Sequence, residues 1–451
     1  MDVLWGLGGM AGLLLIAVAL STDRRAIRLR TVAGALGLQF GVAALVLYWD
    51  AGAQALEWLS DGVNAVIGTA GDGIDFLFGR LVQGEGTVFA LQVLPVVIFV
   101  ASLVAVLFHL GIMQKIVQVI GGALRLALGT SHTESLNAAA NVFVGQTEAP
   151  LLVRPYLART TPSELFAIMV GGLATVAGTV LVGYSLLGAR LEYLIAASFM
   201  AAPGGLLMAK IVMPETEEPA LVTGARADTE GEDWTHHMHH HHEGHAAPEH
   251  AARGDRSEVG GVTAAAVAAG TAVDASEDEH PRNVIDAAAR GAAEGLRLAL
   301  NIAAMLLAFI SLIALLNLLL GEVGGWFGHP DASFEQLIGY VFAPVMSMIG
   351  VPWAEAVDAG SFVGQKLVLN EFVAFADFGP QADRFSPKTV VVVTFALTGF
   401  ANFSSLAILL GGLGSLVPRR RSDIARFGVR AVLAGTLANL MSAAIAGIFI
   451  G

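Results

Sequence analysis

Residues 141–150 read NVFVGQTEAP and residues 364–374 read GQKLVLNEFVA, two polar stretches in an otherwise apolar chain. Each stretch contains a glycine and one glutamate, Glu148 or Glu371. Non-helical polar backbone persists inside a bilayer only where it is buried in protein or lines a cavity. We therefore predict two re-entrant helical hairpins, each made of two helical halves and a polar tip, in segments 130–156 and 334–378.

The two stretches also indicate an internal repeat. The tetrapeptide FVGQ occurs at 143–146 and again at 362–365. Two apolar runs follow each copy: 163–188 and 191–212 after the first, 388–412 and 427–450 after the second. A match of four residues can also arise by chance or from shared glycine packing. The parallel placement of both polar tips favours an inverted repeat, an arrangement in which many secondary transporters build a site at the bilayer midplane.

Composition excludes an ordinary soluble enzyme. The chain has 451 residues, of which 55% are hydrophobic and only 14% are charged. Soluble domains carry about 25% charged residues. A charged fraction of 14% is too small to cover the surface of a soluble globule of this size. The chain has no cysteine, which excludes disulfides, thiolate metal sites and cysteine nucleophiles.

Hydropathy predicts an all-α polytopic membrane protein with about eight transmembrane helices, two re-entrant hairpins and interfacial helices. A span needs about 20 apolar residues. Candidates lie near 3–20, 31–48, 87–109, 163–188, 191–212, 299–320, 388–412 and 427–450. The first run could be a signal peptide, but Asp2 replaces the basic start of such peptides, so we favour an uncleaved span. Segments 53–82 and 112–128 suit interfacial helices, or core helices packed on the bundle.

Basic residues predict the orientation. Arginines cluster after the first span (Arg24, Arg25, Arg28 and Arg30) and after the seventh (Arg419, Arg420 and Arg421). Cytoplasmic loops carry the excess of arginine and lysine. Placing both clusters in the cytoplasm puts both termini outside the inner membrane and brings Arg154, Arg159 and segment 214–282 to the cytoplasmic side.

Segment 214–282 differs from the rest of the chain. Residues 214–280 contain fifteen acidic residues and three arginines, a net charge of −12 out of −13 for the whole chain. Nine of the twelve histidines lie there, and 236–245 reads HHMHHHHEGH. Such a tract can bind zinc, nickel or copper. We favour a disordered cytoplasmic linker, because a segment this polar cannot bury a core.

These features divide the chain into six parts. We expect N-terminal spans and an interfacial helix in 1–86, and a scaffold span with an interfacial helix in 87–129. The first hairpin with two spans occupies 130–213, the linker 214–282, a long scaffold span 283–333, and the second hairpin with two spans 334–451.

Polar residues near both tips are candidates for function. A carboxylate at the bilayer centre costs roughly 2.5–3.5 kcal/mol on insertion scales. The runs after each hairpin are themselves interrupted, as GGLATVAGTV at 171–180 and GFANFSS at 399–405. A helix-packing salt bridge to either glutamate, for instance from Lys366, is the structural alternative. We favour function, because hydroxyl and amide groups cluster with the two glutamates.

At these residues the chain resembles the concentrative nucleoside transporter family. NVFVGQTEAPLLVRPY (141–156), NEFVA (370–374) and GFANFSS (399–405) are similar to its three signature stretches. MVGGLATVAGTVL (169–181), AASFMAAPGG (196–205) and PETEE (214–218) are similar too, and the resemblance runs from about residue 87 to the end. It implies a cation-coupled homotrimeric symporter in which a mobile unit containing the hairpins alternates access against a scaffold.

The resemblance also implies site residues. Gln146, Thr147 and Glu148 would contact the nucleobase, on which Val180 and Phe400 would pack. Glu371, Asn402 and Ser405 would bind the ribose. Sodium would lie at Asn141, Val144, Thr175 and Val176, two of them through backbone oxygen. A buried carboxylate accepts strongly from vicinal hydroxyls, in keeping with the role implied for Glu371.

Three alternatives remain at this stage. Coupling to protons is the first, although the intact QTEAP at 146–150 favours sodium. A metal-ion transporter with the histidine tract as sensor is the second. An intramembrane enzyme is the third, and we do not expect an enzyme because the sequence has no HExxH, GxSxG or Walker motif. We expect nucleoside and lipid as partners, and no nucleic acid.

Overall fold

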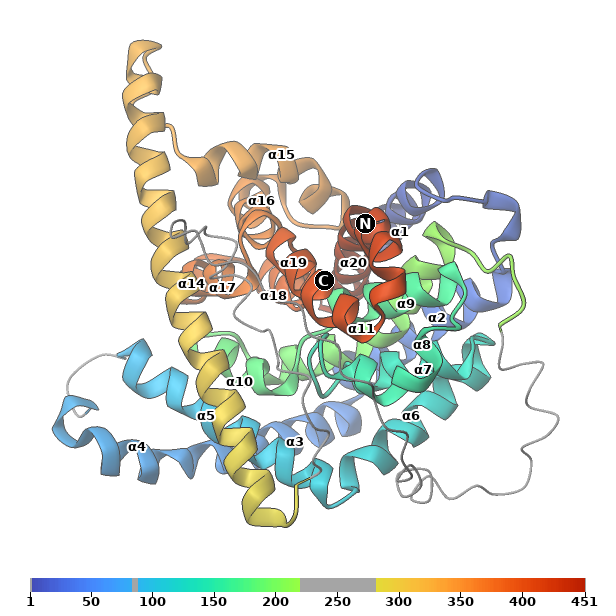
Figure 1. Ribbon diagram of the computed structural model, residues 1–451. Helices are drawn as coiled ribbons and strands as arrows, with labels where there is room; N and C mark the ends of the chain where they lie inside the picture. Colours follow the sequence, from blue (N-terminus) through green and yellow to red (C-terminus); the bar gives the residue numbers. More distant parts are fainter. Residues whose placement is uncertain (1, 83–87, 220–280, 451) are drawn as a thin grey trace, which may run out of the picture.

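The computed structural model describes residues 2–82, 88–219 and 281–450, and all regular elements in these ranges are helical (Figure 1). Six spans in these ranges are long and apolar enough to cross a membrane: Leu29–Tyr48, Phe89–His109, Pro162–Leu186, Leu191–Val212, Val284–Trp326 and Pro418–Ile450. Three of them, the first, the third and the last, contain more than one helical element. The two other predicted spans correspond to the apolar helix α1 (Asp2–Ala19) and to the broken pair α18 (Pro387–Leu397) and α19 (Phe403–Leu416). The prediction of an all-helical multi-pass membrane protein is confirmed.

The first predicted hairpin consists of α7 (His132–Ala140), a non-helical tip, the 3₁₀ helix η4 (Ala149–Val153) and the short α8 (Arg154–Leu157). Ser131 starts α7 with a reciprocal cap: its hydroxyl accepts from the backbone of Glu134, whose carboxylate accepts from the backbone of Ser131. Two elements follow, the broken span α9 (Pro162–Ala174) plus α10 (Gly178–Leu186), and α11 (Leu191–Val212).

The second segment differs in detail from the prediction, because 334–378 holds three helices rather than two halves. They are α15 (Phe334–Met348), α16 (Trp353–Val368) and α17 (Glu371–Phe378). The polar stretch that contains Glu371 interrupts the chain between α16 and α17, whereas α15 turns into α16 through 118° and packs against it. A Cβ at Gly360 would lie 2.7 Å from the Gly339 carbonyl oxygen, so glycine permits that close packing. The 3₁₀ helix η5 (Gly379–Arg384), α18, α19 and α20 (Arg421–Ile450) follow.

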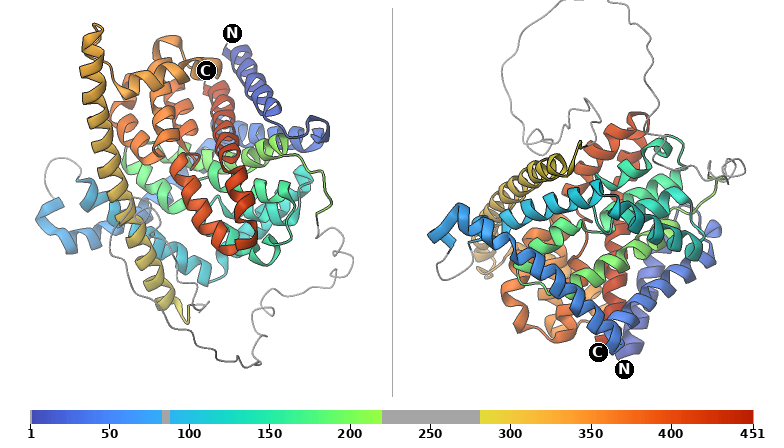
Figure 2. Two further views of the ribbon diagram at one scale, coloured as in Figure 1. Left: turned by 45° about the horizontal axis from the view of Figure 1, so that its top comes forward. Right: turned by 90° about the horizontal axis from the view of Figure 1, so that it is seen from below.

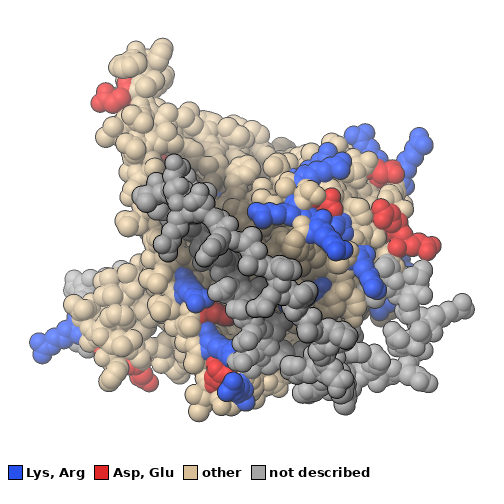
Figure 3. All heavy atoms as spheres, viewed as in Figure 1, with Lys and Arg blue, Asp and Glu red and all other residues tan. Residues whose placement is uncertain are grey.

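Helices α9, α11, α18 and α20 form the centre of the bundle, and α14 (Val284–Trp326) runs along its flank (Figures 1 and 2). Helix α14 crosses α5 (Phe89–His109) closely, because Cβ atoms at Gly291 and Gly295 would lie within 2.8 Å of α5 atoms. Small residues permit such close helix packing in membranes. The upper part of α14 and the adjoining α15 show almost no charge in Figure 3.

The two segments predicted as interfacial helices differ from one another. Helices α3 (Asp50–Gly68) and α4 (Ala70–Phe78), followed by η3 (Gly79–Val82), expose large side chains such as Trp58 and Phe76. Helix α6 (Ile112–Leu128) buries one regular face against α7 and the bundle. Of the two alternatives given for segment 112–128, α6 therefore corresponds to a helix packed against the bundle.

The basic loops gather at one end of the bundle. Thr22 N donates to Val212 O at 2.9 Å, which places the loop after α1, with η1 (Arg24–Ala26), beside the end of α11. Arg420 donates to Thr160 O at 2.7 Å, and Thr161 donates to Glu215 at 2.9 Å. Both chain termini lie at the opposite end from the start of α14 (Figure 2). The histidine tract and most of the predicted linker lie outside the described residues.

Candidate functional site

Two broken spans meet at the centre of the bundle. Helix α9 ends at Ala174 and α18 ends at Leu397, and in both the next residue is a threonine whose hydroxyl donates to the carbonyl four residues earlier. These bonds are Thr175 to Gly171 at 2.8 Å and Thr398 to Thr394 at 2.7 Å. Phe400 N donates to Thr175 O at 3.1 Å, which joins the two breaks directly. The equivalent geometry supports the internal repeat.

Glu371 is the buried carboxylate beside these breaks. It is the first residue of α17, which Asn370 caps through a 3.0 Å bond from Val373 N, and it is 4% exposed. Tyr184 OH donates to Oε1 at 2.9 Å and Asn402 Nδ2 donates to Oε2 at 2.8 Å. An ionised carboxylate with both oxygens engaged still has lone pairs for further donors.

Asn402 and Ser405 are fixed by the start of α19. Asn402 caps this helix, and its Oδ1 accepts from Ser405 N at 2.7 Å and from Ser404 Oγ at 2.7 Å. Its amide nitrogen is thereby turned toward Glu371. The structure thus brings together the three residues that the sequence analysis assigns to ribose.

Tyr184 is absent from the sequence prediction. It follows Val180 by four residues on α10, so the two lie on one helix face. Its ring is fully buried, stacked on Phe375 with centroids 4.5 Å apart and edge-on to Phe372 at 4.8 Å. No polar break in the sequence marks Tyr184, because it lies within an apolar run.

The tip of the first hairpin contacts α9, α10 and α19. A Cβ at Gly172 would lie 2.7 Å from Gln146 Cβ, and a Cβ at Gly412 would lie 2.8 Å from the Thr147 methyl carbon, so both glycines admit the tip. Gln146 is buried and its Oε1 has no hydrogen-bond partner among the described residues, whereas Glu148 is exposed. None of the hydrogen bonds in the described ranges joins this tip to Glu371.

Val180 and Phe400 lie on the two broken spans. Val180 is buried in the first turn of α10, and Phe400 is partly buried in the α18–α19 break. They therefore flank the region between the breaks.

The residues proposed for sodium offer oxygen ligands. Asn141 is fully buried and donates from Nδ2 to Asn137 O at 2.9 Å, yet its Oδ1 has no hydrogen-bond partner among the described residues. It lies against the last turns of α9, since a Cβ at Gly172 would be 3.7 Å from this oxygen. Thr175, Val144 and Val176 are buried on the adjoining segments. An orphaned buried oxygen fits a hard cation, which prefers oxygen ligands.

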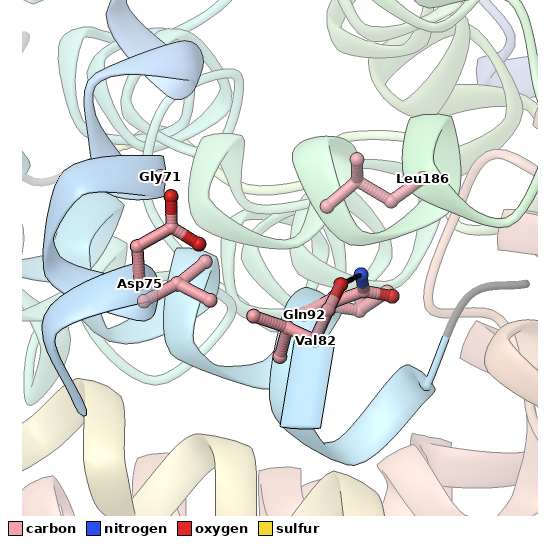
Figure 4. Close-up of a pocket in the computed structure, with 7 residues that line it drawn as sticks. Gly71, Asp75, Val82, Gln92 and Leu186 are labelled. Carbon is pink, nitrogen blue, oxygen red and sulfur yellow. Dashed lines mark hydrogen bonds between the residues drawn. The ribbon is translucent and has the colours of Figure 1, made fainter. Parts of the chain in front are cut away.

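Two other features lie apart from this centre. A cavity of about 310 Å³ between α4, α5 and α10 is lined by Asp75 and Gln92 among others (Figure 4). Gln92 is already engaged, with bonds to Val82 O and from Val88 N, and none of the predicted site residues lines this cavity. Within the described residues no group of three or more His, Asp or Glu could hold a metal ion.

A buried carboxylate between two broken helices, inside a re-entrant hairpin bundle, is the site architecture of a membrane transporter. Family models described as Na⁺ dependent nucleoside transporter N-terminus and C-terminus match residues 8–81 and 193–447, and one described as nucleoside recognition matches 90–190. The chain belongs to the concentrative nucleoside transporter family. This confirms the resemblance found in the sequence.

Relatives match along the whole chain. The uncharacterized transporter YutK of Bacillus subtilis is 50% identical over 451 residues, 100% of both chains. The nucleoside permease NupC of Helicobacter pylori is 43% identical, covering 99% of this chain and 98% of its own. The solved structure of CNTnw in an inward-facing substrate-bound state is 48% identical with a TM-score of 0.85, covering 100% of this chain and 98% of that one. Family and fold indicate a transporter rather than an enzyme.

Proposed function

We propose that the protein is a symporter that imports nucleosides with sodium by alternating access. The observation that carries this proposal is Glu371, a buried carboxylate whose oxygens are held by Tyr184 and Asn402 from opposite broken spans. Vicinal ribose hydroxyls are donors that such a carboxylate accepts strongly. Asn402 and Ser405 would complete the ribose contacts.

The nucleobase would lie between the first hairpin tip and the breaks. Gln146 Oε1 is a buried acceptor that lacks a donor, and a base edge can supply one. Thr147 and Glu148 would complete the polar contacts, and Val180 with Phe400 would pack against the base. An unpaired buried acceptor is costly, so a ligand that pairs it gains affinity.

Sodium would bind Asn141, Val144, Thr175 and Val176. The orphaned Asn141 Oδ1 supports a cation, and the family models that match the chain are described as sodium dependent. A membrane potential of 100 mV contributes about 2.3 kcal/mol per charge to uptake. Proton coupling is the second candidate, since a hydrogen-bonded buried carboxylate can also carry a proton.

We further propose the assembly and orientation. Segments 130–213 and 334–451 would form the mobile unit, and 1–129 with 283–333 the scaffold of a homotrimer. The end of the bundle that gathers Arg24–Arg30, Thr160 and Arg420 would face the cytoplasm, with the 214–282 linker, and both termini would face outside.

Uptake of radiolabelled uridine into proteoliposomes tests the function. We expect uptake to require an inward sodium gradient and to be blocked by excess unlabelled nucleoside. Absence of nucleoside uptake under both sodium and proton gradients would contradict the proposal. Uridine uptake that persists when Zn²⁺ is chelated would distinguish the proposed nucleoside symporter from a metal-ion transporter.

A further inference from the structure

Lys366 is a buried cation for which the proposed function assigns no role. The residue is 1% exposed, and in the part of the chain that the structure describes it has no carboxylate within 4.0 Å. The packing salt bridge to Glu371, an alternative left by the sequence, is therefore not formed. Its ammonium donates instead to Ala396 O at 2.7 Å and to Asn439 Oδ1 at 2.7 Å. A lysine at membrane depth is costly and indicates function by default.

Asn439, in the middle of α20, links this ammonium to both broken spans. Its Nδ2 donates to Ala174 O at 2.6 Å and to Thr398 O at 2.9 Å. These carbonyls lie at the ends of α9 and α18, where the last carbonyls of a helix have no partner within the helix. Helix C-termini also carry partial negative charge, which a cation stabilises.

The repeat places Lys366 and the proposed sodium at corresponding helix ends. Val144 belongs to the first FVGQ copy, and Lys366 directly follows the second copy. Two of the proposed sodium ligands, Thr175 and Val176, directly follow the end of α9. The Lys366 ammonium lies at the end of α18, where it donates to Ala396 O, two residues before Thr398. Both threonines make the same bond to the carbonyl four residues earlier.

We propose that Lys366 is a tethered cation that does for the second repeat what the coupling sodium does for the first. Its ammonium holds the end of α18 in the unwound shape that presents Asn402 and Ser405, and Asn439 is the positioning residue that couples this end to the end of α9. The proposal rests on the proposed function. It implies that only the first repeat draws a cation from solution, so that one coupling cation accompanies each nucleoside.

The test uses the full-length protein in detergent, with uridine affinity and melting temperature as readouts over a sodium series. Lys366→Met keeps the aliphatic stem but removes the charge, and we expect uridine to bind roughly tenfold more weakly at saturating sodium, as for the loss of a charged hydrogen bond. Lys366→Ala leaves room for a small cation. We expect methylammonium to tighten uridine binding to Lys366→Ala and to raise the melting temperature of this variant, and to have neither effect on the wild type.

Controls separate the role of charge from that of packing. Lys115→Met removes a lysine charge at an exposed position on α6 and should match the wild type in both readouts. Uridine affinity of Lys366→Met within about twofold of the wild type would overturn the proposal. So would a Lys366→Ala protein that responds to methylammonium no more than the wild type. Should Lys366→Ala not fold, Lys366→Met decides alone. Failure of the proposed function would show separately, as wild-type protein that does not bind uridine.

Discussion

The phenol of Tyr184 donates a 2.9 Å hydrogen bond to Glu371 Oε1, and this bond joins the first repeat to the second. Tyr184 comes from the broken span α10, and Glu371 from the hairpin helix α17. Because Asn402 engages the other carboxylate oxygen at 2.8 Å, the carboxylate is oriented before any ligand arrives. Preorganisation of this kind lowers the cost of binding.

Tyr184→Phe should weaken nucleoside binding while preserving the fold. The ring would keep its stacking on Phe375, but Glu371 would lose one donor. A hydrogen bond to a charged group contributes about 1.5–3 kcal/mol, so we expect a loss of roughly tenfold in affinity. Calorimetric titration with uridine checks this. Tyr193→Phe, on the partly buried surface of α11, is the matched control and should bind as the wild type.

Glu371→Gln should nearly abolish uptake although the protein still inserts. Glutamine has almost the same size but offers one neutral acceptor, and its amide group opposes the donors of Tyr184 and Asn402. Uridine uptake normalised to membrane protein is the measurement. Glu192→Gln, which breaks an exposed ion pair with Arg190, supplies the control. Near-normal uptake by Glu371→Gln would refute the ribose role.

Gly399→Ala should destabilise the protein. A Cβ there would lie 2.3 Å from Asn439 Oδ1 and 2.7 Å from Ala174 O, so it would push apart the network that joins the broken spans. Overpacking of this kind costs about 1–3 kcal/mol. Gly411→Ala on α19 meets no atom within 4 Å and should leave the melting temperature unchanged or slightly raised. Equal melting temperatures of the two variants would contradict this account.

The sequence was sufficient for the fold class because membrane depth makes polar residues conspicuous. Glu371, Asn402 and Ser405 stand out because each interrupts an apolar run, and the family resemblance groups them as ribose ligands. Tyr184 could not be identified in this way, because a tyrosine with an apolar ring does not interrupt an apolar run. The three-helix form of 334–378 was also missed, since the turn at Gly350 lies between two segments of similar composition. The network of Lys366 and Asn439 depends on contacts between residues 73 positions apart, which no local pattern reports.

Single cysteines can test the orientation cleanly, because the chain has none of its own. Asp331→Cys lies between α14 and α15, and Ser415→Cys lies near the end of α19; both positions are exposed. We expect a membrane-impermeant maleimide to label Asp331→Cys on intact cells and Ser415→Cys only after permeabilisation. The cysteine-free parent controls for background. The reverse pattern would invert the proposed topology and place both termini in the cytoplasm.

Sodium should raise nucleoside affinity, and Asn141→Ala should remove most of this effect without loss of the fold. Asn141 Oδ1 is buried without a hydrogen-bond partner among the described residues. Removing this oxygen therefore deletes a proposed sodium ligand but leaves no hydrogen-bond donor unpaired. Val144 and Val176 can offer only backbone oxygens, so their substitution would test less. Melting temperature without sodium should therefore change little, whereas its rise on adding sodium should shrink.

The coupling itself follows from the position of Asn141. Bound sodium would fix the first hairpin against the end of α9, and Gln146, which packs on Gly172 of α9, would thereby be placed for the nucleobase. Coupling between two ligands is reciprocal, so nucleoside must also tighten sodium binding by the same factor. The measurement is uridine affinity over a sodium series balanced with choline at fixed pH, in the wild type and in Asn141→Ala. A wild type that is insensitive to sodium but steeply dependent on pH would establish proton coupling and refute the sodium site, while the nucleoside site built on Glu371 would stand.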